Sequence, residues 1–333
     1  MPVCMSGKSY GDFMYNFQSL NFPRLPTISN ANVGMVFMIT AMMLLPIGDT
    51  LAKLLTSVVS PAEVAMWRFL AQALCLVPLA FVLRRRLRGA MFSPIVAFSG
   101  VLIVISVTTL ITAFAVMAIA TAIAIFFVEP LILTILASVF LRETIGPRRL
   151  VAVGVGLLGA LIVIRPGFSE FGFATILPLI SACAYAANMI VLRYACQERS
   201  SLTVQCGATI YAALAMVFLV FMLNMNGDIA FSVPSQPSWF WLAILGAGAL
   251  AALCFLLIAE AFRRSEAGAL APFQYLEILG ATAAGFLVFG DFPDSLTWLG
   301  ITIILASGFY VFHREQKANK NHNAQTARRG GAR

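Results

Sequence analysis

The sequence predicts an all-α integral membrane protein of ten transmembrane helices, built as two five-helix repeats with inverted topology. The first observation is the composition, which is 60% hydrophobic and only 11% charged, far from the balance of a soluble domain. The second is that apolar runs of about 20 residues, enough to cross a hydrocarbon core of roughly 30 Å, recur along almost the whole chain. These runs are continuous rather than alternating, which favours helices over a membrane β-barrel. The third observation is a weak similarity between the two halves.

Ten spans with short loops are expected from these runs, with boundaries uncertain by about two to four residues. The spans begin near Val33, Pro61, Ser93, Ala120, Arg149, Phe173, Leu202, Phe240, Ala267 and Leu296. Residues 31–166 then form the first repeat and residues 172–313 the second. Residues 1–30 are a cytoplasmic segment without the compact apolar core and cleavage site of a signal peptide. Residues 314–333 form a disordered basic cytoplasmic tail.

Basic residues gather in alternate loops and in the tail. They are Arg84, Arg85, Arg86, Arg88, Arg142, Arg148, Arg149, Arg193, Arg199, Arg263, Arg264, Arg314, Lys317, Lys320, Arg328, Arg329 and Arg333. If the chain crosses ten times, all of these lie on one side, and only Arg165 among the basic residues outside the spans lies on the other. The positive-inside rule therefore predicts a multi-pass membrane protein with both termini in the cytoplasm. The net charge of +8 is mostly this topology signal, so no nucleic-acid partner is expected.

The similarity between the halves is clearest where "AFAVMAIATAIAIFFVE" is aligned with "AFRRSEAGALAPFQYLE". In this alignment Glu129 matches Glu277. Further matches bring Ala113 onto Ala261, Phe114 onto Phe262, Glu143 onto Asp291 and Gly154 onto Gly300. Because five is odd, the second repeat must enter the membrane from the opposite face, which is the inverted symmetry of many alternating-access transporters. Chance similarity between apolar helices is the alternative.

Several motifs, in their order and spacing, resemble those of the drug/metabolite transporter superfamily and its ten-helix, two-repeat EamA group. They are "GDTLAKLL" with Lys53, "PAEVAMWRFL" with Arg68, "VEPLILTILASVFLRETIG" with Pro130 and Glu143, "GLLGALIVIRPG", and "GALAPFQYLEILGATAAGFLVFGDFPDSLTWLGITIILASGFY". The resemblance runs from about Val33 to Phe312 and implies a transporter of small metabolites in the bacterial inner membrane. The second half has Ala208 where Arg68 stands in the first, so the repeats are not functionally symmetric.

Glu129 and Glu277 are the central charged residues inside the predicted membrane region. A charged side chain deep in a bilayer costs a few kcal/mol or more, so each needs a partner, a water-filled cavity or a proton. The inverted repeat brings the two spans towards a shared axis at the midplane, where transporters of this design bind substrate. We therefore expect both carboxyl groups to face a cavity. The alternative is that both are protonated and hydrogen-bond to neighbouring helices.

Polar and aromatic residues flank the two glutamates. Phe126, Phe127, Gln274 and Tyr275 are the predicted substrate-binding neighbours, because aromatic rings beside polar groups suit a flat or amphipathic solute. Packing is the alternative for any single ring. Pro130 and Pro272 interrupt the hydrogen-bond ladders of their helices and are expected to kink them.

A second group of charges lies nearer the outer end of the first two spans. Asp49 and Lys53, four residues apart, share a helix face and can neutralise each other, and Arg68 lies at comparable depth. These three residues are predicted to form a charge network or gate at the outer mouth, which is either purely structural or in contact with the substrate. Glu143 and Asp291, at span ends, are expected to anchor the helices.

An enzyme is not expected. His313 and His322 are the only histidines, neither the HExxH pattern nor a nucleotide-binding loop is present, and the six cysteines are scattered without metal-site spacing. No cofactor or metal is therefore predicted. The driving force is then a gradient of the solute or of a coupled ion, which defines a secondary transporter.

The substrate prediction rests on resemblance. The segments "FFVEP" and "PFQYLEI" resemble the bacterial riboflavin uptake members of the family, which implies riboflavin uptake. An exporter of amino acids or of cationic, amine metabolites is the alternative, and a channel-like or structural membrane protein is the alternative of another class. The expected partners are a small-molecule substrate and the lipid bilayer, and a homodimer is compatible with the sequence.

Overall fold

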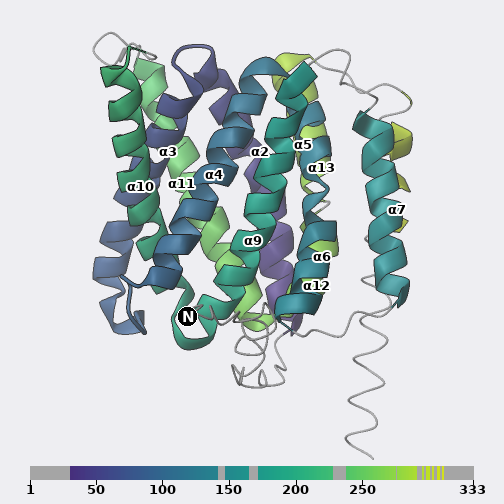
Figure 1. Ribbon diagram of the computed structural model, residues 1–333, viewed down its shortest axis with the longest axis horizontal. Coiled ribbons are helices and arrows are strands. Elements are labelled where there is room, and N and C mark those ends of the chain that lie inside the picture. The colour runs from purple at the N-terminus through teal and green to yellow at the C-terminus, as the bar shows by residue number, and fades with distance from the viewer. Residues whose placement is uncertain are drawn as a thin grey trace, which may run out of the picture.

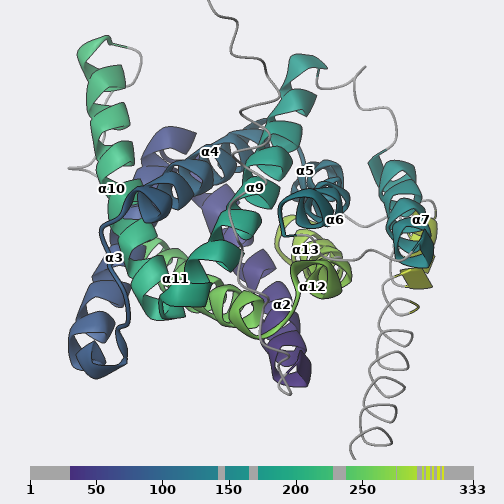
Figure 2. The ribbon, with the colours of Figure 1, turned by 60° about the horizontal axis from the view of Figure 1, so that its bottom comes forward.

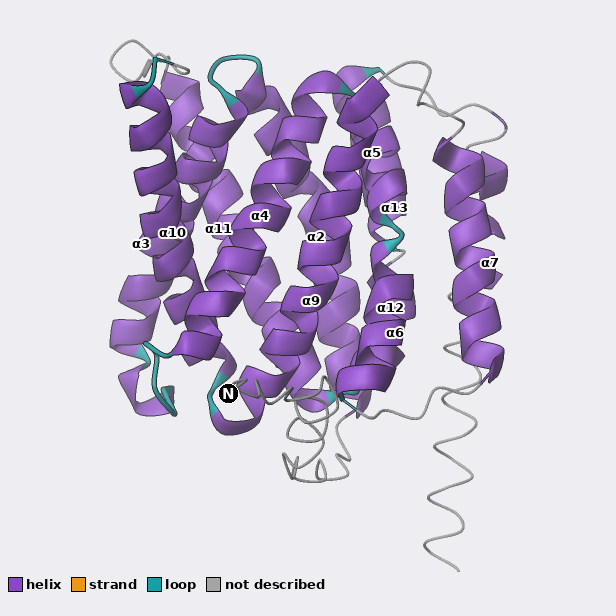
Figure 3. Cartoon of the chain, viewed as in Figure 1, coloured by secondary structure: helices purple, strands orange, loops and turns teal. Residues whose placement is uncertain are grey.

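The computed structural model describes residues 31–141, 147–164, 172–227, 238–274 and 276–290, with single positions between 295 and 310. Helices dominate the described residues, and they stand side by side as a bundle (Figures 1 and 3). The all-helical prediction is therefore confirmed for this part of the chain.

Among the described residues, six helices are long and apolar enough to cross a membrane. They are α2 (Ala31–Thr56), α3 (Pro61–Val82), α4 (Pro94–Val116), α9 (Ile176–Glu198) together with the preceding 3-10 turn η2 (Gly172–Thr175), α10 (Ser201–Met225) and α11 (Ser238–Arg264). These six match the first, second, third, sixth, seventh and eighth predicted spans. A short 3-10 turn, η1 (Arg84–Arg86), follows α3.

The predicted fourth and ninth spans are each broken into shorter helices. The fourth consists of α5 (Ile119–Phe126) and α6 (Glu129–Phe140), and the ninth of α12 (Ala267–Gln274), α13 (Glu277–Ala284) and a π-helical turn, η4 (Gly285–Phe289). The bounds of α12 and the start of α13 follow those of α5 and α6 at one constant interval in the chain. The two breaks therefore fall at equivalent positions of the two repeats.

The fifth and tenth predicted spans are less completely described. The fifth corresponds to α7 (Pro147–Ile164), which has 18 residues and lies beside α5 and α6. The tenth falls in the region where only single helical positions are described. The total of ten helices therefore stays a prediction.

The break in the fourth span has a local cause. Pro130, the second residue of α6, has no N–H to donate to the carbonyl of Phe126, and its ring crowds that carbonyl. The N–H of Phe127 keeps its helical bond to Ile123 at 3.0 Å and also donates to Ala124 at 3.3 Å, and the N–H of Val128 donates to Ile125 at 3.3 Å in a tighter turn. In the ninth span Leu276 donates to Phe273 at 3.1 Å in the same way. Pro272 lies within α12, before the break, so it does not occupy the position of Pro130.

The packing of the helices repeats itself between the two halves. Helix α2 packs along α11, and their counterparts in the other repeat, α9 and α4, pack along each other in the same way. Helix α3 packs against its own counterpart, α10. The broken helices form the third such relationship, because α6 lies beside α12 and α13 beside α5 (Figure 2). Figure 1 shows α5 above α6 and α13 above α12, so the two broken spans run in opposite directions. This is the arrangement expected of inverted repeats.

Small residues and polar pairs hold these helices together. A Cβ atom added to Gly248 of α11 would lie 2.4 Å from the Cβ of Ala71 in α3, so only glycine allows this approach. Interhelical hydrogen bonds link Gln72 to Thr209 at 3.0 Å and Ser99 to Asn188 at 2.6 Å. Inside a lipid bilayer there is no hydrophobic force between apolar helices, so close packing and interhelical hydrogen bonds drive their association.

Two charged residues have roles that the charge pattern does not indicate. Glu63 belongs to the capping box of α3, where its carboxylate accepts from the backbone N–H of Ser60 at 3.1 Å and from the Ser60 hydroxyl at 2.9 Å. Arg193 was predicted to follow the sixth span. It lies within α9, is buried, and donates to the carbonyl of Phe262 in α11.

Candidate functional site

The breaks in the fourth and ninth spans place two acids at equivalent positions. Glu129 is the first residue of α6, and Glu277 is the first residue of α13. The first N–H groups of a helix have no partners within that helix, and the helix dipole makes this end partially positive. Each carboxyl group therefore lies at the positive end of a half-helix inside the bundle.

The antiparallel packing of the broken helices brings the two acids together. Both are buried, with Glu129 0% and Glu277 6% exposed. The carboxyl groups lie close enough for Glu129 to act electrostatically on Glu277. The structure thus joins the two residues that the repeat alignment matched.

Asp49 of α2 and Arg68 of α3 lie in the same buried region. Both are almost fully buried, and Arg68 interacts electrostatically with Asp49 and with Glu277. Within the described residues, no carboxylate oxygen lies within 4.0 Å of the Arg68 guanidinium. The Arg68 guanidinium thus acts electrostatically on two carboxyl groups, those of Asp49 and Glu277, without a direct ion pair. We call Asp49, Arg68, Glu129 and Glu277 the acidic cluster.

Aromatic and amide side chains complete the surroundings of Glu129. Tyr185 of α9 is buried and interacts electrostatically with Glu129, Glu277 and Asp49. The Phe126 ring meets the Tyr185 ring nearly edge-on, with 5.5 Å between the ring centroids. The Gln274 side chain, at the end of α12, reaches towards the Glu129 carboxyl group. A ring pair and an amide thus border the acidic cluster.

Several polar atoms of this region have no hydrogen-bond partner among the described residues. They are both carboxyl oxygens of Glu129, the hydroxyl of Tyr185 and Oε1 of Gln274, all of which are inaccessible to solvent. Buried polar groups in proteins are nearly always hydrogen-bonded, since an unpaired one costs about 1–3 kcal/mol. Four buried polar atoms from three helices, α6, α9 and α12, therefore lie in this region without a partner among the described residues.

The other predicted site residues lie outside this group. Lys53 donates to the carbonyl of Met117 at 3.3 Å and lies 4.8 Å from the centroid of the Phe289 ring, whereas Asp49 interacts with Arg68. Phe127 packs into an apolar cluster with Ile119, Ile123 and Ile278. Only one of the two adjacent phenylalanines therefore borders the acidic cluster. Tyr275, Glu143 and Asp291 lie outside the described residues.

Sequence reasoning missed Tyr185. It stands in "SACAYAANMI", a run of small residues in an apolar helix, and an isolated hydroxyl-bearing ring among small residues is the signal that indicates an inward-facing position. Cys254 of α11, interpreted from the sequence as a packing residue, is buried and also lies within the electrostatic reach of Asp49 and Glu277.

A bundle of spanning helices in which two antiparallel broken helices meet at buried charges is the architecture of a small-molecule transporter. The EamA-like transporter family matches residues 32–165 and 172–312, one match for each half. The chain therefore belongs to the EamA-like transporter family, and the predicted duplication is confirmed.

Relatives of the chain bear the names of two kinds of transporter. A riboflavin transporter of Vibrio cholerae is 29% identical over 202 residues, which span 60% of this chain and 64% of that protein. S-adenosylmethionine uptake transporters of Rickettsia felis and Rickettsia prowazekii are 26% and 25% identical, over 83% and 88% of this chain and 92% and 97% of theirs. The match to the riboflavin transporter thus covers less than two thirds of that relative's length. The match to the S-adenosylmethionine transporters is nearly complete.

One solved crystal structure superposes on the chain with a TM-score of 0.65 at 15% sequence identity. The superposition covers 85% of this chain and 96% of the other. At this identity the likeness shows the fold alone.

Proposed function

We propose that the protein is a secondary transporter that takes up a small heteroaromatic metabolite across the bacterial inner membrane by alternating access, with riboflavin as the first candidate. The observation that carries the proposal is the meeting of the two half-helix starts at Glu129 and Glu277, bordered by the Phe126–Tyr185 ring pair. Transporters with inverted repeats bind their solutes where discontinuous helices meet.

The surroundings of Glu129 suit a flat ring with polar edges. Phe126 and Tyr185 are both buried, and their rings would offer apolar area to an aromatic solute once the half-helices separate, because aromatic pairs prefer offset or edge-on arrangements. The carboxyl group of Glu129 and Oε1 of Gln274 can accept hydrogen bonds from ring N–H groups or hydroxyls. Riboflavin, a fused heteroaromatic ring with a hydroxylated side chain, offers both kinds of donor.

S-adenosylmethionine is the second candidate, and the charge balance favours it. The acidic cluster has three carboxyl groups against one guanidinium, an excess that suits a solute carrying positive charge. The relatives named for this solute also match over most of their length. The two candidates share a heteroaromatic ring and differ in charge.

Alternating access would use the two breaks as hinges. Each break replaces helical hydrogen bonds by tighter turns, and interrupted helices bend more readily than continuous ones. Half-helices α6 and α12 at one end of the bundle and α5 and α13 at the other would then open in turn. A gradient of the solute or of a coupled ion would drive the cycle.

Growth and uptake assays test the proposal. Expression of the chain in a riboflavin-auxotrophic bacterium is expected to restore growth on low external riboflavin, and cells should accumulate labelled riboflavin. The same cells receive labelled S-adenosylmethionine in parallel. Accumulation of S-adenosylmethionine alone would make it the substrate and leave the proposed uptake mechanism in place. Uptake of neither solute, with the protein present in the membrane, would overturn uptake and leave the export of a cationic metabolite as the alternative.

A further inference from the structure

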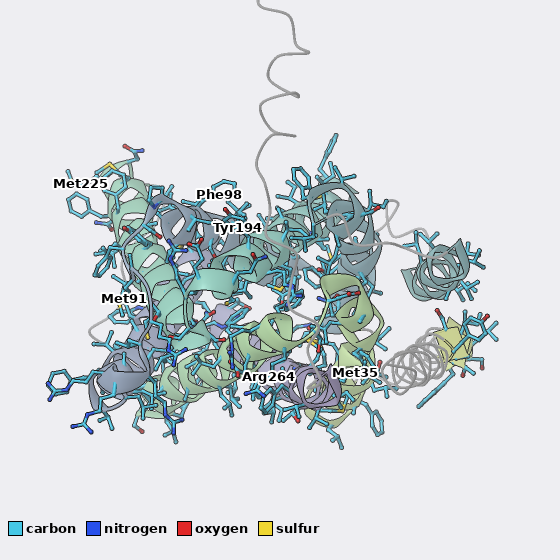
Figure 4. The ribbon with its side chains drawn as sticks, turned by 90° about the horizontal axis from the view of Figure 1, so that it is seen from below. Met35, Met91, Phe98, Tyr194, Met225 and Arg264 are labelled. Atoms are coloured by element: carbon cyan, nitrogen blue, oxygen red, sulfur yellow. The ribbon has the colours of Figure 1, made fainter. Side chains whose placement is uncertain are left out.

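A cavity of about 710 Å³ lies at the end of the bundle where the basic loops gather. It is formed by the ends of α3, α9, α10 and α11, and Figure 4 looks onto this end, with Arg264 labelled at the end of α11. Six arginines line it: Arg85, Arg86, Arg88, Arg199, Arg263 and Arg264. The acidic cluster contributes no residue to its lining.

The second-repeat arginines of this cavity are partly neutralised. Nε atoms of Arg263 and Arg264 donate to the two oxygens of Glu260 at 2.8 and 2.7 Å, so one carboxylate serves two guanidinium groups. Arg199 lies 3.6 Å from Glu198, which is exposed. These three arginines therefore face two carboxylates and retain a net positive charge.

The first-repeat arginines have no such compensation. Arg85, Arg86 and Arg88 are exposed, and none of them forms an ion pair within the described part of the chain. The cavity thus holds six guanidinium groups and two carboxylates.

The loop that bears these arginines is fixed in place. The backbone N–H of Arg88 donates to the hydroxyl of Thr203 at 3.2 Å, and its carbonyl accepts from the N–H of Ser200 at 3.1 Å. Arg199 in turn donates through Nε to the carbonyl of Ala90 at 3.2 Å. The guanidinium groups therefore extend from a backbone tied to the start of α10, which reduces the ordering cost of binding.

The walls of the cavity are apolar below this basic rim. Leu79, Leu83, Leu256 and Leu257 line them. Next to Leu79 and Leu83, the Phe81 and Val82 side chains of α3 are 75% and 76% exposed, as expected of residues facing lipid. At this end of α3, beside lipid-facing side chains, the basic rim suits a phosphate group and the apolar walls suit the acyl chains joined to it.

We propose that this cavity binds an anionic phospholipid of the adjacent leaflet, with the headgroup phosphate between Arg85, Arg86 and Arg88 and the first acyl carbons along the leucines. Arginine forks bind phosphate with two hydrogen bonds, and basic pockets between membrane helices on this side bind lipid headgroups. Because α3 belongs to the first repeat and α9 to α11 to the second, the lipid links the two repeats. The site is independent of the transported solute.

The test uses the purified full chain in a neutral detergent and measures its melting temperature and lipid binding. Short-chain phosphatidylglycerol is expected to bind and to raise the melting temperature, whereas short-chain phosphatidylcholine is not. The triple variant Arg85→Gln, Arg86→Gln, Arg88→Gln should weaken phosphatidylglycerol binding about 100-fold, since each arginine near the headgroup contributes about a factor of five. Its melting temperature without lipid should stay unchanged.

The matched control removes three charges elsewhere, as Arg328→Gln, Arg329→Gln, Arg333→Gln in the tail, and should keep wild-type binding. If the triple cavity variant does not fold, the single variant Arg86→Gln, with a loss of about five-fold, replaces it. Equal binding of both lipids, or equal losses in cavity and tail variants, would overturn the proposal. Glycerol phosphate binding as tightly as phosphatidylglycerol would assign the cavity to a soluble anion and overturn the phospholipid.

Discussion

Glu129 and Glu277 occupy the same position in two broken helices that run in opposite directions, each as the first residue after its break. Their carboxyl groups lie within electrostatic reach of each other inside the bundle. The positive ends of α6 and α13 stabilise negative charge there, while the repulsion between two carboxylates opposes it. A solute or a proton that changes the charge of one glutamate therefore changes the energy of the other, which provides a physical route for coupling.

The first prediction concerns this pair. Glu129→Gln should lower uptake by about ten-fold or more, because a hydrogen bond to a charged group contributes about 1.5–3 kcal/mol and the amide removes that charge. If the carboxyl group also carries a coupled proton, the variant should lose the pH dependence of uptake. Uptake into vesicles across a pH series, at matched protein level, measures both effects.

Two further variants interpret the result. Glu277→Gln should retain more activity than Glu129→Gln, because Glu277 is more exposed and has Arg68 within reach. Glu266→Gln changes an exposed acid and should behave as wild type. Wild-type rates in both cluster variants at every pH would assign the two glutamates to helix packing.

The second prediction concerns Arg68, the one cation of the acidic cluster. Arg68→Gln should destabilise the protein by about 3 kcal/mol, since it leaves Asp49 and Glu277 buried without their compensating charge. The double variant Asp49→Asn, Arg68→Gln should recover part of this loss. Thermal unfolding in detergent provides the measurement, with the exposed Arg84→Gln as the control. Equal stability of Arg68→Gln and wild type would show that Arg68 does not stabilise the acids.

The sequence contains enough information to predict the helical fold, the duplication and the meeting of the two glutamates. Apolar runs, the spacing of the repeats and the aligned acids can all be read from the order of residues along the chain. The breaks at Glu129 and Glu277 were predicted only as kinks, because a proline indicates a lost hydrogen bond but not where the helix resumes. In the ninth span the break falls after Pro272 rather than at it.

Contacts across the bundle were harder to predict, because they depend on helix rotation. Phe126 and Phe127 are neighbours in sequence, yet one borders the acidic cluster and the other packs among isoleucines. The same limit explains Lys53, which shares α2 with Asp49 but reaches the carbonyl of Met117. The repeat alignment includes no match for Tyr185, so its position beside Glu129 follows only from the packing of α9.

The third prediction tests Tyr185. Tyr185→Phe keeps the ring that packs against Phe126 and removes a hydroxyl that has no hydrogen-bond partner among the described residues, so stability should change by less than about 1 kcal/mol. If the hydroxyl binds the solute, KM should rise by about ten-fold at unchanged maximal rate, since a lost hydrogen bond costs about 1.4 kcal/mol. Tyr211→Phe, whose ring packs against Phe92, is the matched control. An unchanged KM in Tyr185→Phe would remove the hydroxyl from the site.

The fourth prediction concerns orientation. Reporters that are active only in the cytoplasm should be active when fused after residue 333 or within the loop of residues 84–88, because the basic residues of three loops gather at one end of the bundle. Reporters active only in the periplasm should be inactive at both points. Periplasmic activity at the C-terminus would contradict the ten-helix topology and place that end outside.

The fifth prediction addresses the hinge at the start of α6. Pro130→Ala supplies the N–H that can donate to the carbonyl of Phe126 and removes the ring that crowds it, so α5 and α6 should join more regularly. The protein should melt at the same temperature or higher, while the uptake rate should fall by about ten-fold, as expected if the break has to bend during each cycle. Pro78→Ala, at an exposed position inside α3, is the matched control and should leave uptake unchanged. Because an unfolded variant would also lose uptake, the melting temperature distinguishes the two cases. A Pro130→Ala protein that is stable and transports at the wild-type rate would show that the proline shapes the helix without serving the transport cycle.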